Sequence, residues 1–388
     1  MADTLRVGLL VEPAGWHLTS IIQSCALHPE VGTIAIADAT GQTFGKFRSP
    51  TGSSTDPQWR TKPHVPGSGP PAGWTKAGHE FDTAAALGGK LKATYTDHRK
   101  MLAEFKPDLV LLTLEPAKMP SLIVDCLNAG AHVYHEKPGC VRVEDYYPVV
   151  EAARRTGKLV CMALAMRGYS NIRQARRILA RGDLGKLFAI KTHYVADHTR
   201  TWLWKELADG WFYDRTRAGG GHLTILGCHY LDMLRYVTGA NIVEVTGFVD
   251  TLGGEPMNAE DAYCLSFRFD NGMLGSMTGG YFLENNKQDD MVVWGREGWL
   301  RFDPEPATYL EWFSRRGDGR DTPLRRVAFT GSDLWSGGEQ FKHEVFQACL
   351  GKGEPPIRVE DGLWMLEAAF AAYRASTTGQ AQNVRLGT

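Results

Sequence analysis

The N-terminal half of the chain alternates short apolar strands with helices, and this alternation constrains the fold more than any other feature. LRVGLLV (5–11) predicts a buried strand, LTSIIQSCALH (18–28) a helix, and VGTIAIAD (31–38) a second strand. The pattern continues with strands at 92–97, 107–114 and 131–137 and with helices at 97–105 and 120–130. Such alternation with short links predicts an α/β unit built on a doubly wound parallel sheet.

The C-terminal half has a different pattern, in which long strands follow one another. A hairpin is predicted over 261–281 because Asn271-Gly272 separates two alternating runs. Further strands are predicted at 186–197, 242–250 and 290–303, and helices at 145–157, 171–185, 223–237, 339–350 and 360–375. This half therefore predicts an α+β domain with a large, mostly antiparallel open sheet. We expect one domain over 1–160 and a second over 161–388, whose last helix packs back toward the first.

Composition excludes several classes of partner. The chain has 388 residues and a formal net charge of −1, so no overall field attracts nucleic acid or an anionic membrane. No apolar run approaches 18 residues, and the N-terminus shows no signal-peptide pattern. Seven scattered cysteines without a C-x-x-C pair predict reduced thiols and a cytoplasmic protein.

Asp38 ends the second predicted strand, 30 positions after Gly8. Nucleotide-binding folds keep an acid at this place to bind the ribose hydroxyls of the adenosine. Because a carboxylate there repels a 2′-phosphate, NAD is expected as cofactor and NADP is less favoured. The alternative is an aspartate that only caps a turn.

The loop after the first strand departs from the glycine-rich fingerprint of dinucleotide-binding folds. Residues 11–17 read VEPAGWH, in which Pro13 lacks a backbone donor, Glu12 adds negative charge, and only Gly15 allows close backbone approach. A second unusual segment, 41–81, is rich in Gly, Pro, Ser and Thr. It is expected to be a lid or arm, with an oligomer contact or partial disorder as alternatives.

Two motifs carry candidate chemistry. Glu136-Lys137-Pro138 follows a strand, at the edge where open α/β sheets bind ligands. RAGGGHLTILGCHYLD (217–232) places three glycines before a helix, which predicts bare N–H groups there. His229 and Asp232 lie three apart on one helix face, so the acid could orient an imidazole that transfers protons. The alternative is a buried structural histidine behind a capping glycine run.

Together these motifs resemble the Gfo/Idh/MocA oxidoreductases, the relatives of glucose–fructose oxidoreductase and inositol dehydrogenase. The likeness rests on Glu136-Lys137-Pro138, on Ala218 with Gly219-Gly220-Gly221, and on Gly227, His229 and Asp232. It implies a Rossmann-type first domain and an NAD(P)-dependent enzyme that transfers hydride at a secondary hydroxyl of a sugar, cyclitol or derivative. It also implies that Lys137 and His229 are catalytic and that the Lys137–Pro138 bond is cis.

The resemblance, the strand-end position of Asp38 and the aromatic and polar side chains of 193–215 together predict binding residues. The cofactor would contact Gly8, Val11, Glu12, Asp38, Thr113, Glu115, Glu136 and Lys137. The substrate would contact Arg167, Tyr169, His198, Trp202, Arg215 and His229. Ile225 stands where the family often has an aspartate, and Met119 where a histidine is common. A metal site made of His193, His198, His222 and His229 is conceivable, but their irregular spacing argues against it, and no metal is expected.

Two other functions remain open. A lyase or glycosidase-like enzyme could hold NAD tightly and use it transiently, without net redox. A catalytically silent sugar or nucleotide sensor could share the scaffold, since the glycine fingerprint is missing. The expected partner of the enzyme is a small-molecule carbohydrate substrate, and a homodimer or homotetramer is expected.

Overall fold

The structure is a computed structural model. It describes residues 4–49, 53–54, 74–75, 80–197, 210–253, 257–283, 288–304, 309–316, 324–328 and 331–385. The predicted insertion 41–81 lies largely outside these residues, as do His198 and Trp202.

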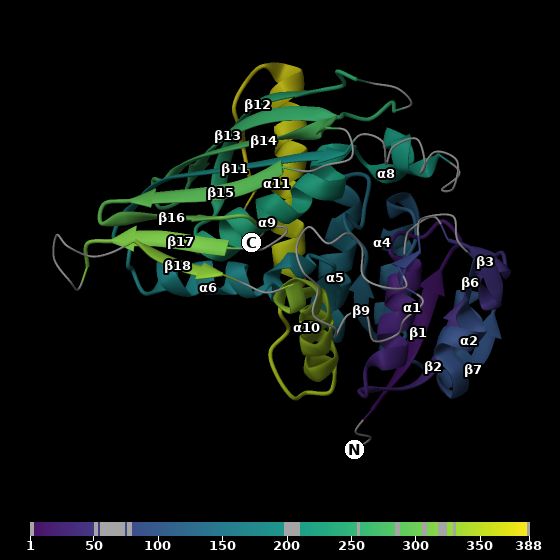
Figure 1. Cartoon of the computed structure of the whole chain (residues 1–388). Coiled ribbons are helices and arrows are strands. Elements are labelled where there is room, and N and C mark those ends of the chain that lie inside the picture. The colour runs from purple at the N-terminus through teal and green to yellow at the C-terminus, as the bar shows by residue number, and fades with distance from the viewer. Residues whose placement is uncertain are drawn as a thin grey trace.

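The first domain is built on a six-stranded, fully parallel sheet with the order β10-β9-β8-β1-β2-β7 (Figure 1). Its strands are β1 (Leu5–Val11), β2 (Val31–Ala37), β7 (Leu91–Tyr95), β8 (Leu109–Thr113), β9 (His132–His135) and β10 (Val160–Met162). This is the Rossmann order. Successive strands are added toward one edge of the sheet from β1 and toward the other edge from β8, so the order reverses between β1 and β8. The prediction of a doubly wound sheet is confirmed, and the boundary expected at residue 160 falls inside β10.

Helices connect these strands close to the predicted positions. They are α1 (Leu18–Leu27), α3 (His98–Glu104), α4 (Met119–Asn128) and α5 (Tyr147–Thr156). α3 begins where the Asp97 side chain accepts a hydrogen bond from the Arg99 N–H, and α5 ends at Gly157 in the left-handed conformation. The described part of the insertion adds β3 (Lys46–Arg48), β4 (Ser53–Ser54), β5 (Trp74–Thr75) and β6 (Glu80–Asp82), and α2 (Thr83–Leu87) follows it.

The second domain contains a nine-stranded sheet with the order β18-β17-β16-β15-β11-β14-β13-β12-β19. β11 and β14 run parallel, and the other neighbours are antiparallel. The strands are β11 (Leu187–Asp197), β12 (Ile242–Asp250), β13 (Ala262–Phe269), β14 (Leu274–Leu283), β15 (Gln288–Gly295), β16 (Gly298–Phe302), β17 (Tyr309–Ser314), β18 (Arg325–Ala328) and β19 (Gln382–Asn383).

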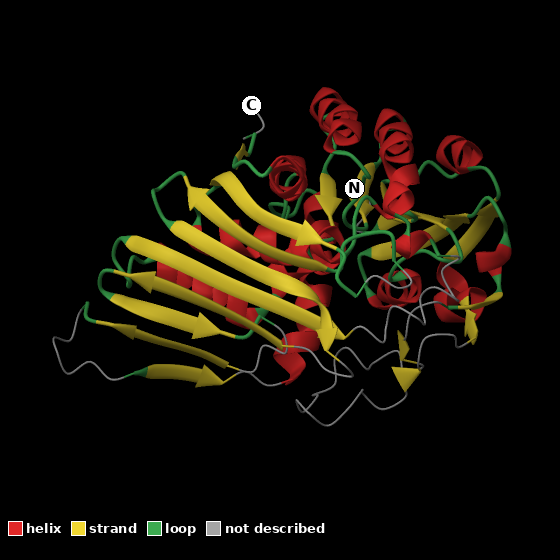
Figure 2. Cartoon of the chain, turned by 90° about the horizontal axis from the view of Figure 1, so that it is seen from above, coloured by secondary structure: helices red, strands yellow, loops and turns green. Residues whose placement is uncertain are grey.

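This sheet confirms the predicted hairpin and corrects the run 290–303, which is two strands joined at Arg296-Glu297. β17, β18 and β19 were not predicted. In Figure 2 the helices lie behind the sheet, so its near face is open. The helices are α6 (Ser170–Ala180), α8 (Arg215–Ala218), α9 (Cys228–Thr238), α10 (Gly331–Cys349) and α11 (Val359–Thr378).

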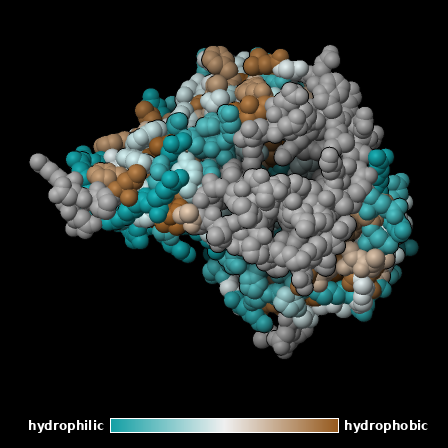
Figure 3. Space-filling view, in the orientation of Figure 1, coloured by the Kyte–Doolittle hydropathy of each residue, from teal (hydrophilic) through white to brown (hydrophobic). Residues whose placement is uncertain are grey.

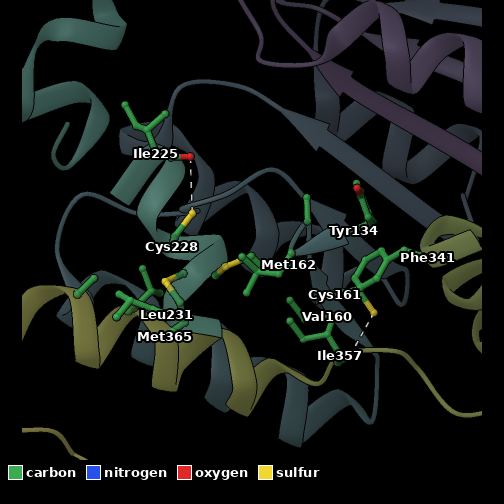
Figure 4. Close-up of a cluster of buried hydrophobic side chains, with 14 of the residues drawn as sticks. Tyr134, Val160, Cys161, Met162, Ile225, Cys228, Leu231, Phe341, Ile357 and Met365 are labelled. Atoms are coloured by element: carbon green, nitrogen blue, oxygen red, sulfur yellow. Dashed lines mark hydrogen bonds between the residues drawn. The ribbon is translucent and has the colours of Figure 1, made fainter. Parts of the chain in front are cut away.

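An apolar seam joins the two domains. α11 contacts α5 and β10 of the first domain as well as β12 of the second. Figure 4 shows side chains from β9, β10, α9, α10 and α11 in one buried cluster. Burying such side chains stabilises the fold by about 1.5–3 kcal/mol each. The seam therefore fixes α9, and the residues at its N-terminus, against the end of β9.

The described surface is mixed in character. Figure 3 shows hydrophilic residues over most of the described part of this face, with hydrophobic patches between them. Among the described helices, none combines the length and apolarity that crossing a bilayer requires.

The fold buries histidines in neutral form, which predicts sensitivity to acid. Burial lowers the pKa of His135 to about 4 and that of His222 to about 3, and it lowers the pKa of His229 well below its usual value. Below pH about 6.5 the unfolded chain binds protons that the folded chain does not, so stability falls as pH falls. We expect a loss of up to about 4 kcal/mol per pH unit between pH 6 and 4 from these three residues.

Denaturant unfolding at a series of pH values measures this slope. His222→Phe should reduce the slope by the contribution of about one proton taken up on unfolding. A free energy of unfolding that stays constant from pH 6 to 4 would contradict the assignment of neutral buried histidines.

Candidate active site

The candidate site lies where three strand ends meet. β1, β8 and β9 are parallel neighbours, so their carboxyl ends lie at one edge of the sheet. The loops that follow them are 12–17, 114–118 and 136–138. Ligands of open α/β sheets bind at this edge, at the point where strand order reverses.

Lys137 is held at the seam between the domains. Its side chain is only 5% exposed, and the Lys137–Pro138 bond is cis, as the resemblance implies. Its ammonium donates to the Ile225 carbonyl oxygen at 2.5 Å and lies 5.4 Å from the centre of the Trp16 ring. Burial lowers the pKa of Lys137, and the nearby Cys228 and Glu136 offset only part of this effect.

Ile225 offers Lys137 a hydrogen-bond acceptor through its backbone carbonyl, because its apolar side chain has none. It lies in a π-helical turn, Leu223–Gly227, directly before α9. Such turns widen a helix locally and are frequent at functional sites. Here the Ile225 carbonyl accepts the hydrogen bond of Lys137, although the carboxylate common in the family is absent. A neutral carbonyl stabilises an ammonium less than a carboxylate does, which agrees with the lowered pKa.

His229 is half-buried beside Lys137 with its Nδ1 enclosed, but Asp232 does not orient it. The Asp232 carboxylate instead accepts two hydrogen bonds from the Arg167 guanidinium, at 2.5 and 2.8 Å. Burial lowers the pKa of His229, and the charges of Lys137 and His17 lower it further. His229 is therefore neutral near pH 7, and the predicted pairing with Asp232 is wrong.

The Arg167 guanidinium is held by other protein groups and does not face a ligand site. Besides Asp232, its guanidinium contacts Asp361 at 3.2 Å and the Pro356 carbonyl at 3.1 Å. The side chain is 6% exposed. Arg167 thus ties α9 to the start of α11, and its predicted role in substrate binding has no geometric support.

N–H groups in and beside the glycine run also have hydrogen-bond partners within the protein. The N–H groups of Gly221 and Leu223 donate to the Glu260 carboxylate at 2.7 and 2.9 Å, and the Tyr373 hydroxyl donates to it at 2.7 Å. A Cβ on Gly221 would lie 1.9 Å from the Glu260 carbonyl oxygen, so glycine is required there. The prediction of bare N–H groups is wrong, and Glu260, which no local pattern marks, satisfies them.

The negative charges of the acids near the first loop are balanced by neighbouring cations. Glu12 accepts hydrogen bonds from the Glu115 N–H at 2.5 Å and from the Lys118 ammonium at 2.7 Å. Glu115 contacts Lys118 at 3.0 Å and Arg217 at 2.6 Å. The negative charge that the sequence places beside a cofactor diphosphate is therefore balanced by two cations, Lys118 and Arg217, that sequence reasoning missed.

Asp38 has the geometry of an aspartate that caps a turn, which was the alternative to ribose binding. It is 1% exposed, and both carboxylate oxygens accept hydrogen bonds from the backbone and hydroxyl groups of Thr40 and Thr43. Gly8 likewise lies inside the sheet, where a Cβ would contact Met101 and Pro107. Neither residue presents a group to a ligand in this structure.

Trp16 and His17 enter the site although neither was predicted. His17 has a φ of 57°, which is unusual for a non-glycine residue and typical of functional sites. Its Nδ1 lies 3.1 Å from Glu136 Oε1. The Trp16 ring lies 4.5 Å from that of Phe212. The first loop thereby contacts both the Glu136-Lys137 step and the second domain.

The other predicted residues within the described part of the chain have the following surroundings. Val11 is buried beside Thr113, whose hydroxyl donates to the Trp16 carbonyl at 2.5 Å. Tyr169 is half-buried at the start of α6. The Arg215 guanidinium lies 5.0 Å from the centre of the Tyr373 ring.

The polar atoms at the end of β9 fit the nicotinamide end of a dinucleotide. Among the described residues, Glu136 Oε2 and His229 Nδ1 are buried without a hydrogen-bond partner. Buried polar groups normally have partners, and leaving one unpaired costs about 1–3 kcal/mol. A carboxylate oxygen, an imidazole and the Lys137 ammonium suit a ribose and a substrate hydroxyl.

A Rossmann-type domain joined to an open-sheet domain, with lysine and histidine at their junction, defines a dinucleotide-dependent oxidoreductase. Two family descriptions match the chain: "Oxidoreductase family, NAD-binding Rossmann fold" over residues 76–164 and "GFO/IDH/MocA C-terminal domain" over 172–301. The chain belongs to the Gfo/Idh/MocA family and is an enzyme of that family.

Similar proteins act on sugars and cyclitols. The chain is 25% identical to 1,5-anhydro-D-fructose reductase of Ensifer adhaerens over 67% of this chain and 75% of that one. It is 22% identical to myo-inositol 2-dehydrogenase of Thermotoga maritima over 74% and 82%. A levoglucosan dehydrogenase structure with NADH and L-sorbose has a TM-score of 0.76 at 17% identity, covering 99% of both chains.

The Arg167–Asp232 pair predicts the outcome of one substitution. Asp232→Asn leaves a buried guanidinium with half its charge partners, so we expect a loss of about 3–5 kcal/mol in the free energy of unfolding. Because Asp232 does not contact His229, the pH dependence of turnover should keep its wild-type shape. Denaturant unfolding and a pH–rate profile measure the two effects. A shifted pH–rate profile in a stably folded variant would show that Asp232 does interact with His229.

Proposed function

We propose that this enzyme transfers hydride between NAD(P) and a hydroxyl-bearing carbon of a sugar, cyclitol or derivative. The observation that carries the proposal is the buried Lys137 ammonium on the Ile225 carbonyl, beside a neutral His229. The named activities of the similar proteins support a carbohydrate substrate. NAD is proposed over NADP, as in the sequence analysis, although the geometry of Asp38 adds no support to that preference.

Lys137 and His229 divide the proton chemistry. A bound nicotinamide would supply the acceptor or the donor of hydride for the substrate carbon. In the oxidative direction the hydroxyl proton must leave as the C–H bond breaks. Lys137 as an ammonium can stabilise the alkoxide, and in its neutral form, which burial favours, it can accept that proton. Neutral His229 can pass the proton onward from the substrate oxygen.

Other residues position these two groups. Glu136 would hold the nicotinamide ribose through its unpaired Oε2, while its Oε1 pairs with His17. The Trp16 and Phe212 rings exclude water on one side of the ammonium. A drier site strengthens every charge interaction inside it.

The first test removes the lysine. Lys137→Met keeps the apolar stem but loses the ammonium, so we expect hydride transfer to fall by about 10²–10⁴-fold while nucleotide binding persists. Turnover of a panel of sugars and cyclitols with NAD and NADP measures the first effect, and titration of NADH fluorescence measures the second. Lys100→Met, an exposed lysine on α3, is the matched control. Wild-type turnover in Lys137→Met would exclude the proposed role.

The second test restores the carboxylate that Ile225 replaces. Ile225→Asp places a negative charge near Lys137, which favours the ammonium and raises its pKa by about 1 unit or more. The limb of the pH–rate profile that depends on neutral Lys137 should therefore move to higher pH. Ile225→Asn has similar size without the charge and should move it little. Equal profiles for the two variants would show that Lys137 does not set that limb.

We further propose that the open face of the large sheet forms a homodimer or homotetramer contact. Exposed apolar side chains occur on its strands, among them Phe248 at 78%, Leu274 and Phe282. A second copy of the chain packed on this face would remove these side chains from water. Light scattering coupled to gel filtration gives the mass directly, and a monomer at micromolar concentration would exclude the proposal.

A further inference from the structure

A cluster of metal-ligand side chains lies away from the candidate active site, between the first domain and α10. It consists of His28 and Glu30, in the turn after α1, and His343 on α10. One ligand atom from each residue lies within 4.8 Å of the other two. Nothing in the proposed function uses this cluster. It also differs from the four histidines weighed from sequence, of which His193 pairs with Asp290 and His222 is enclosed by tyrosine rings.

Glu30 has a buried oxygen that points into the cluster without a hydrogen bond. Its side chain is 7% exposed, and among the described residues its Oε2 has no hydrogen-bond donor. His28 Nδ1 lies 3.5 Å from this oxygen. The other oxygen, Oε1, contacts His343 Nδ1 at 2.7 Å and the Gln347 amide at 2.8 Å. A buried carboxylate oxygen with no donor is costly, and a cation would satisfy it.

The surroundings match the outer shell of a metal site. His28 has its Nδ1 toward Glu30 and its Nε2 3.1 Å from the Glu339 carboxylate. Histidines that bind metal usually donate their second ring N–H to such a carboxylate, which fixes the tautomer and raises basicity. Gln347 fixes the Glu30 carboxylate in a similar way. His343 is 41% exposed, so one side of the cluster is open to solvent.

We propose that His28, Glu30 and His343 bind a divalent transition metal, with zinc the best match. Two imidazoles and a carboxylate form the donor set of many zinc sites that keep a water as fourth ligand. Ligand atoms around tetrahedral zinc lie about 3.3 Å apart, given bonds of about 2.0–2.1 Å. The 3.5 Å between His28 Nδ1 and Glu30 Oε2 already fits this separation. His343 Nδ1 lies 2.7 Å from the other oxygen, Oε1, and would exchange that hydrogen bond for a bond to the ion.

Two lysines border the cluster and limit its affinity. Lys342 contacts Glu339 at 2.7 Å, and Lys90 donates to the carbonyls of Cys25, Ala26 and His28. Their charges oppose a dication, so binding should be weaker than in closed structural zinc sites. The ion would tie α10 to the turn after α1, and the expected consequence is stability rather than catalysis.

The test uses the full chain without a histidine tag, freed of metal by chelation. Cobalt(II) titration followed by visible absorption reports tetrahedral coordination, and equilibrium dialysis with zinc gives the stoichiometry. We expect one ion per chain and a rise of a few degrees in Tm with zinc. His343→Ala should abolish binding, and His98→Ala, which removes another histidine–carboxylate pair in the first domain, should leave it unchanged.

The wild-type protein alone can overturn the proposal. If it binds no cobalt or zinc, the cluster is a metal-free network of ion pairs. If binding persists at one ion per chain in both His343→Ala and His28→Asn, the ion sits elsewhere and this assignment is also wrong. Circular dichroism of each variant shows whether a loss of binding reflects the ligand or the fold.

Discussion

The hydrogen bond from the Lys137 ammonium to the Ile225 carbonyl is the interaction on which the rest of the site depends. It joins the end of β9 in the first domain to the turn before α9 in the second. The apolar seam of Figure 4 holds these two elements together. The charge of Lys137 is tolerable only because the carbonyl, the Trp16 ring and nearby Glu136 partly replace water.

The site separates its charges into two groups with different roles. Arg167, Asp232 and Asp361 form a closed network of ion pairs that links α9 to α11. Lys137, His229 and Glu136 keep atoms that are not fully paired. Fully paired groups favour rigidity, whereas groups with spare hydrogen-bonding capacity and lowered pKa values can bind and transfer protons. This contrast supports the assignment of Lys137 and His229 as the reacting pair, with Arg167 as part of the framework.

Much of the fold was predictable from sequence because its signals are local. Strand–helix alternation predicted the parallel sheet, Asn271-Gly272 predicted the hairpin, and Glu136-Lys137-Pro138 pointed to the sheet edge that carries the candidate site. The errors arose where a partner lies far along the chain. Asp232 pairs with Arg167, 65 positions away, and Glu260 reaches Gly221 from 39 positions away. A three-residue spacing in a helix shows which side chains could meet, but it cannot show that a distant arginine competes for the same carboxylate.

The direct test of this account is the pKa of Lys137 in the native enzyme. NMR of the enzyme with isotope-labelled lysines, assigned by comparison with Lys137→Met, follows the titration of this one ammonium. The account predicts that Lys137 titrates at lower pH than the exposed lysines, because burial against a neutral carbonyl disfavours its charge. If Lys137 titrates together with the exposed lysines, the ammonium is not buried at the domain junction, and the proposed proton chemistry would have to be abandoned.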